Sequence, residues 1–468
     1  MIGTSDLSEI RTQARPFTKA LLTSAALAAF LLAVLLAIVF GSLNLFLIVL
    51  GLAALPLIAI SYPLTLAVTF LFLNLLLPKV PLIQIRGYLV PIRIEDVFLG
   101  CALICLCLRY LIFRERPAPN PFLRWMLVFC ATTGISFLFG LFVLRTVPEA
   151  KIGFLFWLRT AEYFAAGYLC LISVTNWKQY RTMIIALGTF VVLIGVYGIL
   201  QEYAIVPIFD AMHLTDEIVV VRFFPGFAEE RLSSTFAGAY DLAAFYLLAL
   251  PILVALLVTA SRSAKLVLAG ILALSFFCFY LTYARTPLAA LMVVLGVCLW
   301  LLGKVRAGIV LALLCVVPAL LLGGFVERLA YAADDPFAYY AFGGRLQLGW
   351  ADALAAAARS PLLGAGPASL HEGMGVDGLY FMLLGMWGLC GLVCFLVLIA
   401  AALRLQRECI TSRNTMQRAL AVGLFAGTFG LLVNGITLDS FFSSKIALSY
   451  WFLMGLLLAG RRLEAQNR

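Results

Sequence analysis

The feature that most constrains this chain is a succession of apolar runs of about 17–25 residues. Each run is long enough to cross the ~30 Å hydrocarbon core of a bilayer as a helix. Of the 468 residues, 64% are hydrophobic and only 12% are charged, which is far from the average of soluble domains. The sequence therefore predicts an all-α polytopic membrane protein, in which residues 1–468 form a single integral membrane domain.

The runs predict about fourteen transmembrane helices. They are expected at residues 20–40, 43–60, 62–78, 94–113, 122–144, 152–175, 182–204, 238–259, 266–284, 286–303, 307–323, 376–402, 419–436 and 442–460. Lys and Arg recur after alternate spans, as in the basic segments 114–124 and 403–418. The positive-inside rule then places both termini in the cytoplasm. The net charge of +10 follows from this topology and from contact with anionic lipid, so no nucleic-acid partner is expected.

The chain carries none of the usual signatures of a cofactor or metal site. Ten of the 11 cysteines lie inside apolar runs and none forms a C-x-x-C pair, so they are interpreted as small apolar packing residues. The sequence contains neither a Walker motif nor a nucleotide-binding glycine loop. We therefore expect no cofactor and no metal, and any energy for a reaction should arrive with the substrate or as a gradient.

Two predicted outer segments are too long to be simple turns: residues 205–237 and residues 324–375. Loops of this length in a compact protein are usually functional. In the second segment, RLQLGWADALAAAARSP predicts an amphipathic helix near residues 344–360. Such a helix can lie in the membrane interface, with Trp350 as its anchor.

Three arginines occur at predicted outer positions, where ionisable groups are costly and tend to be functional. Arg231 precedes the eighth span, Arg285 occupies a tight turn between two spans, and Arg345 follows a Gly-Gly pair. A guanidinium presents a planar fork of donors that suits phosphate oxygens. The three arginines are therefore candidate anion ligands, although pairing with a neighbouring acidic residue is the alternative for Arg231.

Candidate acid/base residues lie in the segment SLHEGMGVDGLYFMLLGMWGLCG, residues 369–391. Asp377 is expected at the N-terminus of a helix, where a carboxylate complements the helix dipole. His371 lies six residues earlier and Tyr380 lies about one turn later. Either Asp377 or His371 can serve as a general base.

A further pair, Arg159 and Glu162, lies within the sixth span at the i,i+3 spacing that allows an ion pair. A structural pair between helices and a role in supporting the site are both open for these two residues.

Four patterns, in this order, resemble the O-antigen ligase and Wzy-type polysaccharide polymerase superfamily. They are RLSSTFAGAYDLAAFYLLALP, YARTPLAAL, GGRLQLGWADALAAAARSPLLGAGP and VDGLYFMLLGMWGLCGLVCF. The resemblance implies a GT-C-like architecture in a bacterial inner membrane. It also implies an inverting glycosyltransferase that acts at the periplasmic face on undecaprenyl-diphosphate-linked glycans.

The same resemblance implies roles for the candidate residues. Arg231, Arg285 and Arg345 would bind the diphosphate, and Asp377 or His371 would act as the base. The remaining three, Arg159, Glu162 and Tyr380, would support the site.

One difference from the family pattern favours the polymerase branch over the ligase branch. Ligases of this family carry His followed by Asn in the fourth pattern, whereas this chain carries Asp377 followed by Gly378. Asp at that position is similar to the polymerases, so we expect a polymerase of lipid-linked repeat units for O-antigen, capsule or exopolysaccharide. The expected partners are the lipid-linked oligosaccharide and the bilayer, and a chain-length regulator is a further candidate.

Two alternatives stay open. A ligase would transfer the glycan to a lipid A-core sugar. A transporter or flippase would move an anionic lipid-linked glycan with the same arginines, but it should show inverted repeats and broken helices near the midplane. Neither feature is clear in the sequence.

Overall fold

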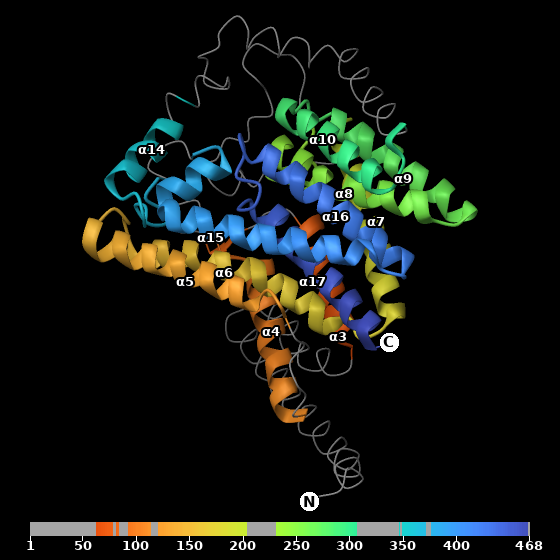
Figure 1. Ribbon diagram of the computed structural model, residues 1–468, viewed down its shortest axis with the longest axis horizontal. Helices are drawn as coiled ribbons and strands as arrows, with labels where there is room; N and C mark the ends of the chain where they lie inside the picture. The colour runs from red at the N-terminus through yellow and green to blue at the C-terminus, as the bar shows by residue number, and fades with distance from the viewer. Residues whose placement is uncertain are drawn as a thin grey trace, which may run out of the picture.

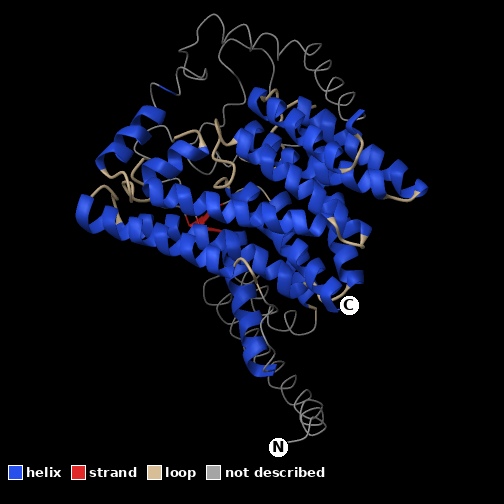
Figure 2. Cartoon of the chain, viewed as in Figure 1, coloured by secondary structure: helices blue, strands red, loops and turns tan. Residues whose placement is uncertain are grey.

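The computed structural model describes residues 62–77, 81–83, 92–113, 120–203, 231–306, 346, 349–370 and 376–466. The described chain is almost entirely helical (Figures 1 and 2). In chain order, its helices are α3 (Pro63–Leu76), α4 (Ile94–Phe113), α5 (Leu123–Phe139), the π-helical η1 (Gly140–Leu144), α6 (Ala150–Ser173), α7 (Trp177–Glu202), α8 (Ala239–Thr259), α9 (Arg262–Tyr280), α10 (Arg285–Leu301), α14 (Gly349–Arg359), α15 (Leu379–Ile410), α16 (Thr415–Asn434) and α17 (Ser444–Gln466).

Apolar helices long enough to cross a membrane confirm the predicted class of fold. Within the described residues, 7 helical segments meet this criterion by length and composition: α5 with η1, α7, α8, α9, α15, α16 and α17. The chain is thus an all-α polytopic membrane protein. The expected spans 20–40, 43–60 and 307–323 lie outside the described residues, so the total of about fourteen stays a prediction.

Two short strands, β1 (Pro81–Ile83) and β2 (Ile92–Arg93), pair antiparallel between α3 and α4. The apolar-run pattern does not predict this hairpin. It delivers Arg93 directly to the start of α4, which becomes important for the candidate site.

The helices pack closely where glycines let two backbones approach. Gly167 of α6 and Gly455 of α17 face each other so closely that a Cβ on Gly455 would overlap the Gly167 carbonyl group. Gly423 of α16 lies in the same way against Ile252 of α8. Small residues at helix crossings are typical of membrane proteins, where close van der Waals packing stabilises the association of helices.

Successive helices run up and down, so that alternate connections meet at the same end of the bundle. At one end, Lys445 at the start of α17 binds the carbonyl groups of Leu77, which follows α3, and of Thr235, which precedes α8. At the other end, Arg461 near the end of α17 pairs with Glu408 near the end of α15, at 2.9 Å. We call these the Lys445 end and the Glu408 end.

Exposed basic side chains gather at the Glu408 end. They are Arg124, Lys178, Arg181, Arg262, Lys265, Lys304, Arg306, Arg404, Arg407, Arg413, Arg418 and Arg461. By the positive-inside rule, this distribution is that expected of a cytoplasmic face.

Helix α15 is broken at Gly388, which has φ 64° and ψ −168°. This conformation is essentially restricted to glycine. The turn formed by residues 361–366 fits into the break, and a Cβ on Gly388 would overlap the backbone of Leu362. The sequence shows no clear sign of a broken helix, so an unbroken helix was expected here, and that expectation is wrong for α15. A glycine in an apolar run does not reveal the break, because the segment that fills it lies more than twenty residues away.

The turn replaces the helical hydrogen bonds that are lost at the break. The amides of Leu389 and Cys390 donate to the carbonyls of Pro361 and Leu362, and the amides of Ala365 and Gly366 donate to Gly385 and Met386 in α15. These four bonds are 2.8–3.1 Å long. Backbone groups inside a membrane need protein partners, because no water is available there.

We predict that Gly388→Ala lowers the free energy of unfolding by about 1–3 kcal/mol, because alanine is strained at this φ and its Cβ meets the inserted turn. The measurement is denaturant unfolding of the purified protein in detergent. Gly270→Ala on α9 is the matched control, since nothing lies within 4 Å of its added Cβ. A Gly388→Ala protein that is as stable as Gly270→Ala would contradict the described break.

Candidate functional site

The turn between α16 and α17, residues 435–443, joins the helix ends that meet at the Lys445 end. The amide of Leu379, the first residue of α15, donates to the Gly435 carbonyl at 2.7 Å. The Tyr163 hydroxyl of α6 donates to the Phe442 carbonyl at 2.7 Å. The Ser443 hydroxyl binds the Asp241 carboxylate near the start of α8 at 2.6 Å. The turn therefore fixes the starts of α15 and α8 and the middle of α6 relative to one another.

Arg231 is buried on the segment that leads into α8, with 6% of its surface exposed. Its Nε donates to the Thr282 carbonyl at 3.0 Å, and its guanidinium carbon lies 4.1 Å from the centre of the Tyr240 ring. Asp241, a sequence neighbour of Arg231, accepts a hydrogen bond from Ser443 as described above. The carbonyl bond and the ring stack fix the plane of the Arg231 fork.

Arg285 is the first residue of α10 and is half-buried. It follows Thr282, the carbonyl partner of Arg231, by three residues, and the Leu232 amide donates to the Leu281 carbonyl at 3.0 Å. The structure thus places the segments that carry Arg231 and Arg285 side by side. The third candidate anion ligand, Arg345, lies outside the described residues.

Asp377 is exposed immediately before α15, and its backbone carbonyl accepts a hydrogen bond from the Trp350 indole of α14. Trp350 is 2% exposed and stacks on Phe381, with ring centres 4.3 Å apart. The prediction that Trp350 anchors a helix in the membrane interface is therefore wrong. The ring is buried because Phe381 covers its face and Asp377 accepts from its N–H group.

The residue after Asp377 has a structural reason to be glycine. Gly378 has φ 111°, and a Cβ there would lie 2.9 Å from the Ile436 carbonyl oxygen. An asparagine would be strained at this φ. The backbone conformation therefore favours the glycine by which this chain differs from the ligase pattern. His371, the other candidate base, lies outside the described residues.

Tyr380, predicted to support the site, links two helices. Its hydroxyl donates to the Leu432 carbonyl near the end of α16 at 2.8 Å. Together with the Leu379 amide bond, this contact fixes the first turn of α15, next to Asp377, against α16. Tyr380 therefore fixes the position of this turn, and its support of a site stays a prediction.

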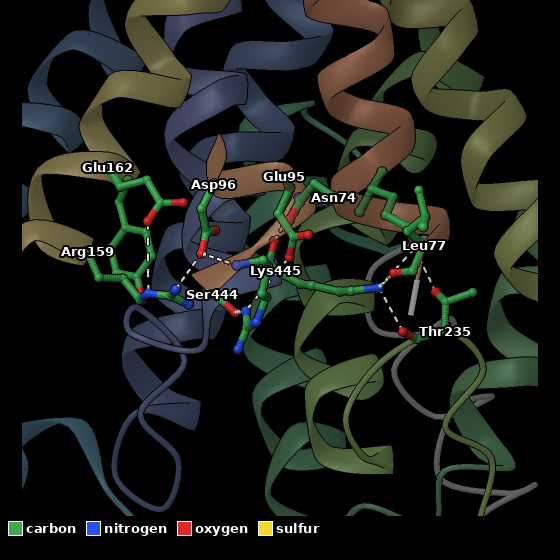
Figure 3. Close-up of polar contacts among 12 residues, drawn as sticks. Asn74, Leu77, Glu95, Asp96, Arg159, Glu162, Thr235, Ser444 and Lys445 are labelled. Atoms are coloured by element: carbon green, nitrogen blue, oxygen red, sulfur yellow. Dashed lines mark hydrogen bonds and ion pairs between the residues drawn. The ribbon is translucent and has the colours of Figure 1, made fainter. Parts of the chain in front are cut away.

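Arg159 lies in a nearly buried ionic cluster at the Lys445 end (Figure 3). The predicted i,i+3 pair with Glu162 is present, with a nitrogen–oxygen distance of 3.9 Å. A shorter ion pair, of 2.6 Å, joins Arg159 to Asp96 in the first turn of α4. Asp96 could not be predicted as a partner of Arg159, because a residue 63 positions away leaves no local signal in the sequence.

Arg93 extends the ionic cluster towards α17. Its guanidinium donates to the Ser444 hydroxyl and lies 3.9 Å from the Glu95 carboxylate. Burial lowers the pKa of Arg93, as does the positive charge of Arg159, whereas the carboxylates of Glu95 and Asp96 raise it. An arginine stays protonated under these conditions. The cluster thus joins the starts of α4 and α17 to α6 through groups of both signs.

The described residues offer little to a metal ion. In the ranges listed above, no group of three or more His, Cys, Asp or Glu side chains is placed to bind one. At the Lys445 end the segments of Arg231 and Arg285 instead lie side by side, and the Asp377 carboxylate precedes α15 at the same end. This arrangement suits an anionic substrate with a hydroxyl that has to lose a proton.

The fold is that of a multi-pass membrane protein in which the segments of two candidate anion ligands, Arg231 and Arg285, lie at one end of the helices. Residues 270–396 match the family model described as O-antigen ligase. This match supports the O-antigen ligase and Wzy-type superfamily, whose members are glycosyltransferase-like ligases and polymerases that act on lipid-linked glycans in a membrane. No curated protein matches the chain. The matched region contains Arg285 and Asp377, whereas Arg231 and the ionic cluster precede it.

We predict that Arg159→Met lowers the free energy of unfolding by about 3 kcal/mol or more, because it leaves the Asp96 carboxylate buried without its counter-charge. Denaturant unfolding in detergent measures the loss, and adding Asp96→Asn should recover part of it. The matched control is Arg404→Met. Its ion pair with Glu408 is exposed, with 84% of the Arg404 side chain accessible, and should contribute little. Equal losses for the two methionine variants would refute a stabilising role of the cluster.

Proposed function

We propose that the protein is an inverting glycosyltransferase that polymerises undecaprenyl-diphosphate-linked oligosaccharide repeat units at the periplasmic face of a bacterial inner membrane. The observation that carries this proposal is that the segments of Arg231 and Arg285 lie side by side at the Lys445 end, the end at which Asp377 precedes α15. The exposed basic residues at the Glu408 end support a cytoplasmic position for that opposite face.

In this proposal the two arginines bind the diphosphate of the donor, which is the growing chain on its lipid carrier. Charge develops on the leaving diphosphate as the bond between the sugar C1 and the phosphate oxygen breaks. Preorganised guanidinium groups stabilise that charge, and those of Arg231 and Arg285 need little rearrangement because their segments are fixed to each other. Arg345 is proposed as a third ligand on the basis of its sequence position alone.

The acceptor is the non-reducing-end hydroxyl of a new lipid-linked unit. Asp377 takes the hydroxyl proton as the oxygen attacks C1 from the face opposite the leaving group. The configuration at C1 is inverted, and undecaprenyl diphosphate leaves. The exposed position of Asp377 and the anchoring of its backbone by Trp350 support this role. The diphosphate bond supplies the energy, so no nucleotide or cofactor is required. A chain-length regulator remains a candidate partner.

An O-antigen ligase is the second candidate, because the matching family model carries that description. Such an enzyme would use the same donor and transfer the glycan to a lipid A-core sugar. The Asp377–Gly378 pair in place of His-Asn favours the polymerase. The strain that any larger residue would meet at Gly378 supports reading this pair as a real difference in the site.

A transporter of an anionic lipid-linked glycan is the third candidate, and the break in α15 is the observation that favours it. The turn 361–366 occupies that break, and its backbone binds the groups that the break frees. These groups are therefore engaged by protein, which supports a rigid scaffold more than an ion-coordinating path.

The deciding experiment uses the purified full-length protein in liposomes with undecaprenyl-diphosphate repeat units. We expect longer lipid-linked glycans to form without lipid A-core. Products that appear only after lipid A-core is added would assign the protein as a ligase. Movement of the lipid-linked glycan across the liposome membrane without a new glycosidic bond would reject the enzyme proposal.

We predict that Asp377→Asn lowers kcat by about 100-fold or more, because the amide cannot accept the acceptor proton. His371→Ala should keep most of the activity in the same assay, and both proteins should purify with normal yield. The opposite pattern, a large loss in His371→Ala with an active Asp377→Asn, would make His371 the base and remove the main argument for the polymerase branch.

A further inference from the structure

We infer that Lys445 is a positioning residue that holds the Arg231 segment in place by binding its backbone. This inference rests on the proposed role of Arg231 in binding the donor diphosphate. It adds a residue from the last helix, outside the region that matches the family model.

Lys445 is an unusual residue for its location. It is 1% exposed and lies in the first turn of α17, where a cation is unfavourable to the helix dipole. Burial of an ammonium group adds a desolvation penalty of several kcal/mol. A residue that carries both costs is expected to make interactions that an apolar residue could not make.

Those interactions are charge-assisted hydrogen bonds to backbone carbonyls. The Lys445 Nζ lies 2.7 Å from the carbonyl oxygens of both Leu77 and Thr235, and 3.4 Å from that of Leu75 (Figure 3). It also lies 5.0 Å from the centre of the Phe236 ring. The carbonyls at the end of α3 lack helical partners, so the ammonium group binds them and Thr235 at once.

The segment 231–238 depends on such contacts because it is not a helix or a strand. The Thr235 hydroxyl donates to the Leu75 carbonyl at 2.6 Å, and the Ser234 hydroxyl donates to the Ile194 carbonyl at 2.7 Å. Ser234 itself has φ 51°, a backbone conformation that non-glycine residues rarely adopt. Side-chain bonds thus determine the shape of the short segment that ends at Arg231.

These contacts connect α17 to Arg231, the residue proposed to bind the diphosphate. Lys445 holds Thr235, and four residues earlier the Arg231 Nε binds the Thr282 carbonyl beside Arg285. Loss of the ammonium group would leave the Thr235 and Leu77 carbonyls without this donor. The segment would loosen, and the spacing between Arg231 and Arg285 would no longer be fixed.

The first test measures the segment directly, by hydrogen exchange of the full-length protein in detergent. In Lys445→Met, which keeps an unbranched apolar side chain, the amides of Leu232 and Phe236 should exchange faster than in the wild type. Ser449→Ala is the matched control, because it alters a buried residue one helical turn along α17. It should leave those amides unchanged. Unchanged exchange in a folded Lys445→Met protein overturns the inference.

The second test measures binding of undecaprenyl diphosphate. Lys445→Met should weaken binding by about tenfold, and Lys445→Arg should recover part of the affinity. Adding Lys445→Met to Arg231→Ala should cause no further loss of affinity, because both changes remove the contribution of Arg231 to binding. Independent, additive losses would overturn the inference. If Lys445→Met does not accumulate, Lys445→Gln, which keeps a neutral donor, replaces it in both tests.

The two tests also separate this inference from the proposed function. If Arg231→Ala binds undecaprenyl diphosphate as the wild type does while Lys445→Met speeds exchange, the role of Arg231 fails and the link to Lys445 stands. If Arg231→Ala loses binding while Lys445→Met changes neither measurement, the link fails and the role of Arg231 stands.

Discussion

A backbone that leaves its helical hydrogen bonds inside a membrane has to find other partners within the protein, because no water is available there. Two parts of this structure depend on that constraint. At the break in α15, four backbone groups bind the inserted turn 361–366. At the end of α3, the carbonyls of Leu75 and Leu77 are bound by the ammonium group of Lys445. The irregular segments that position the candidate site are held through these bonds.

Buried charged residues gather at the end of the bundle that contains Lys445. The arginines among them differ in the contacts that they make. Arg93 and Arg159 are paired with carboxylates, so they join α4, α6 and α17. Arg231 donates to a carbonyl and stacks on an aromatic ring, and these contacts orient its guanidinium. The ion pairs of Arg93 and Arg159 are suited to stabilising the fold, and the oriented guanidinium of Arg231 is suited to an anionic ligand.

Features with a local signal could be predicted from the sequence. The apolar runs predicted helices, because a stretch long enough to span a bilayer has few other structures available to it. The i,i+3 spacing of Arg159 and Glu162 predicted their ion pair, because residues at this spacing lie on the same face of a helix. The sequence predicted a tight turn at Arg285, and the structure has this short connection at residues 281–284, with Arg285 as the first residue of α10 and Pro287 in its first turn.

Features that depend on a distant partner could not be predicted. Asp96 is closer to Arg159 than Glu162 is, but nothing near Asp96 in the sequence indicates this. Trp350 has the spacing of an interface anchor, and its burial follows only from the position of Phe381. Gly388 lies in an apolar run like many other glycines, and its conformation is defined by the turn that fills the break.

The central claim is that Arg231 and Arg285 hold a lipid-linked diphosphate within reach of Asp377. The most direct measurement is a cryo-electron microscopy map of the full-length protein in nanodiscs with undecaprenyl diphosphate bound. The account predicts diphosphate density between the two guanidinium groups, on the side that faces Asp377. Diphosphate density at the Glu408 end, or at the Lys445 end without contact to either arginine, would contradict it.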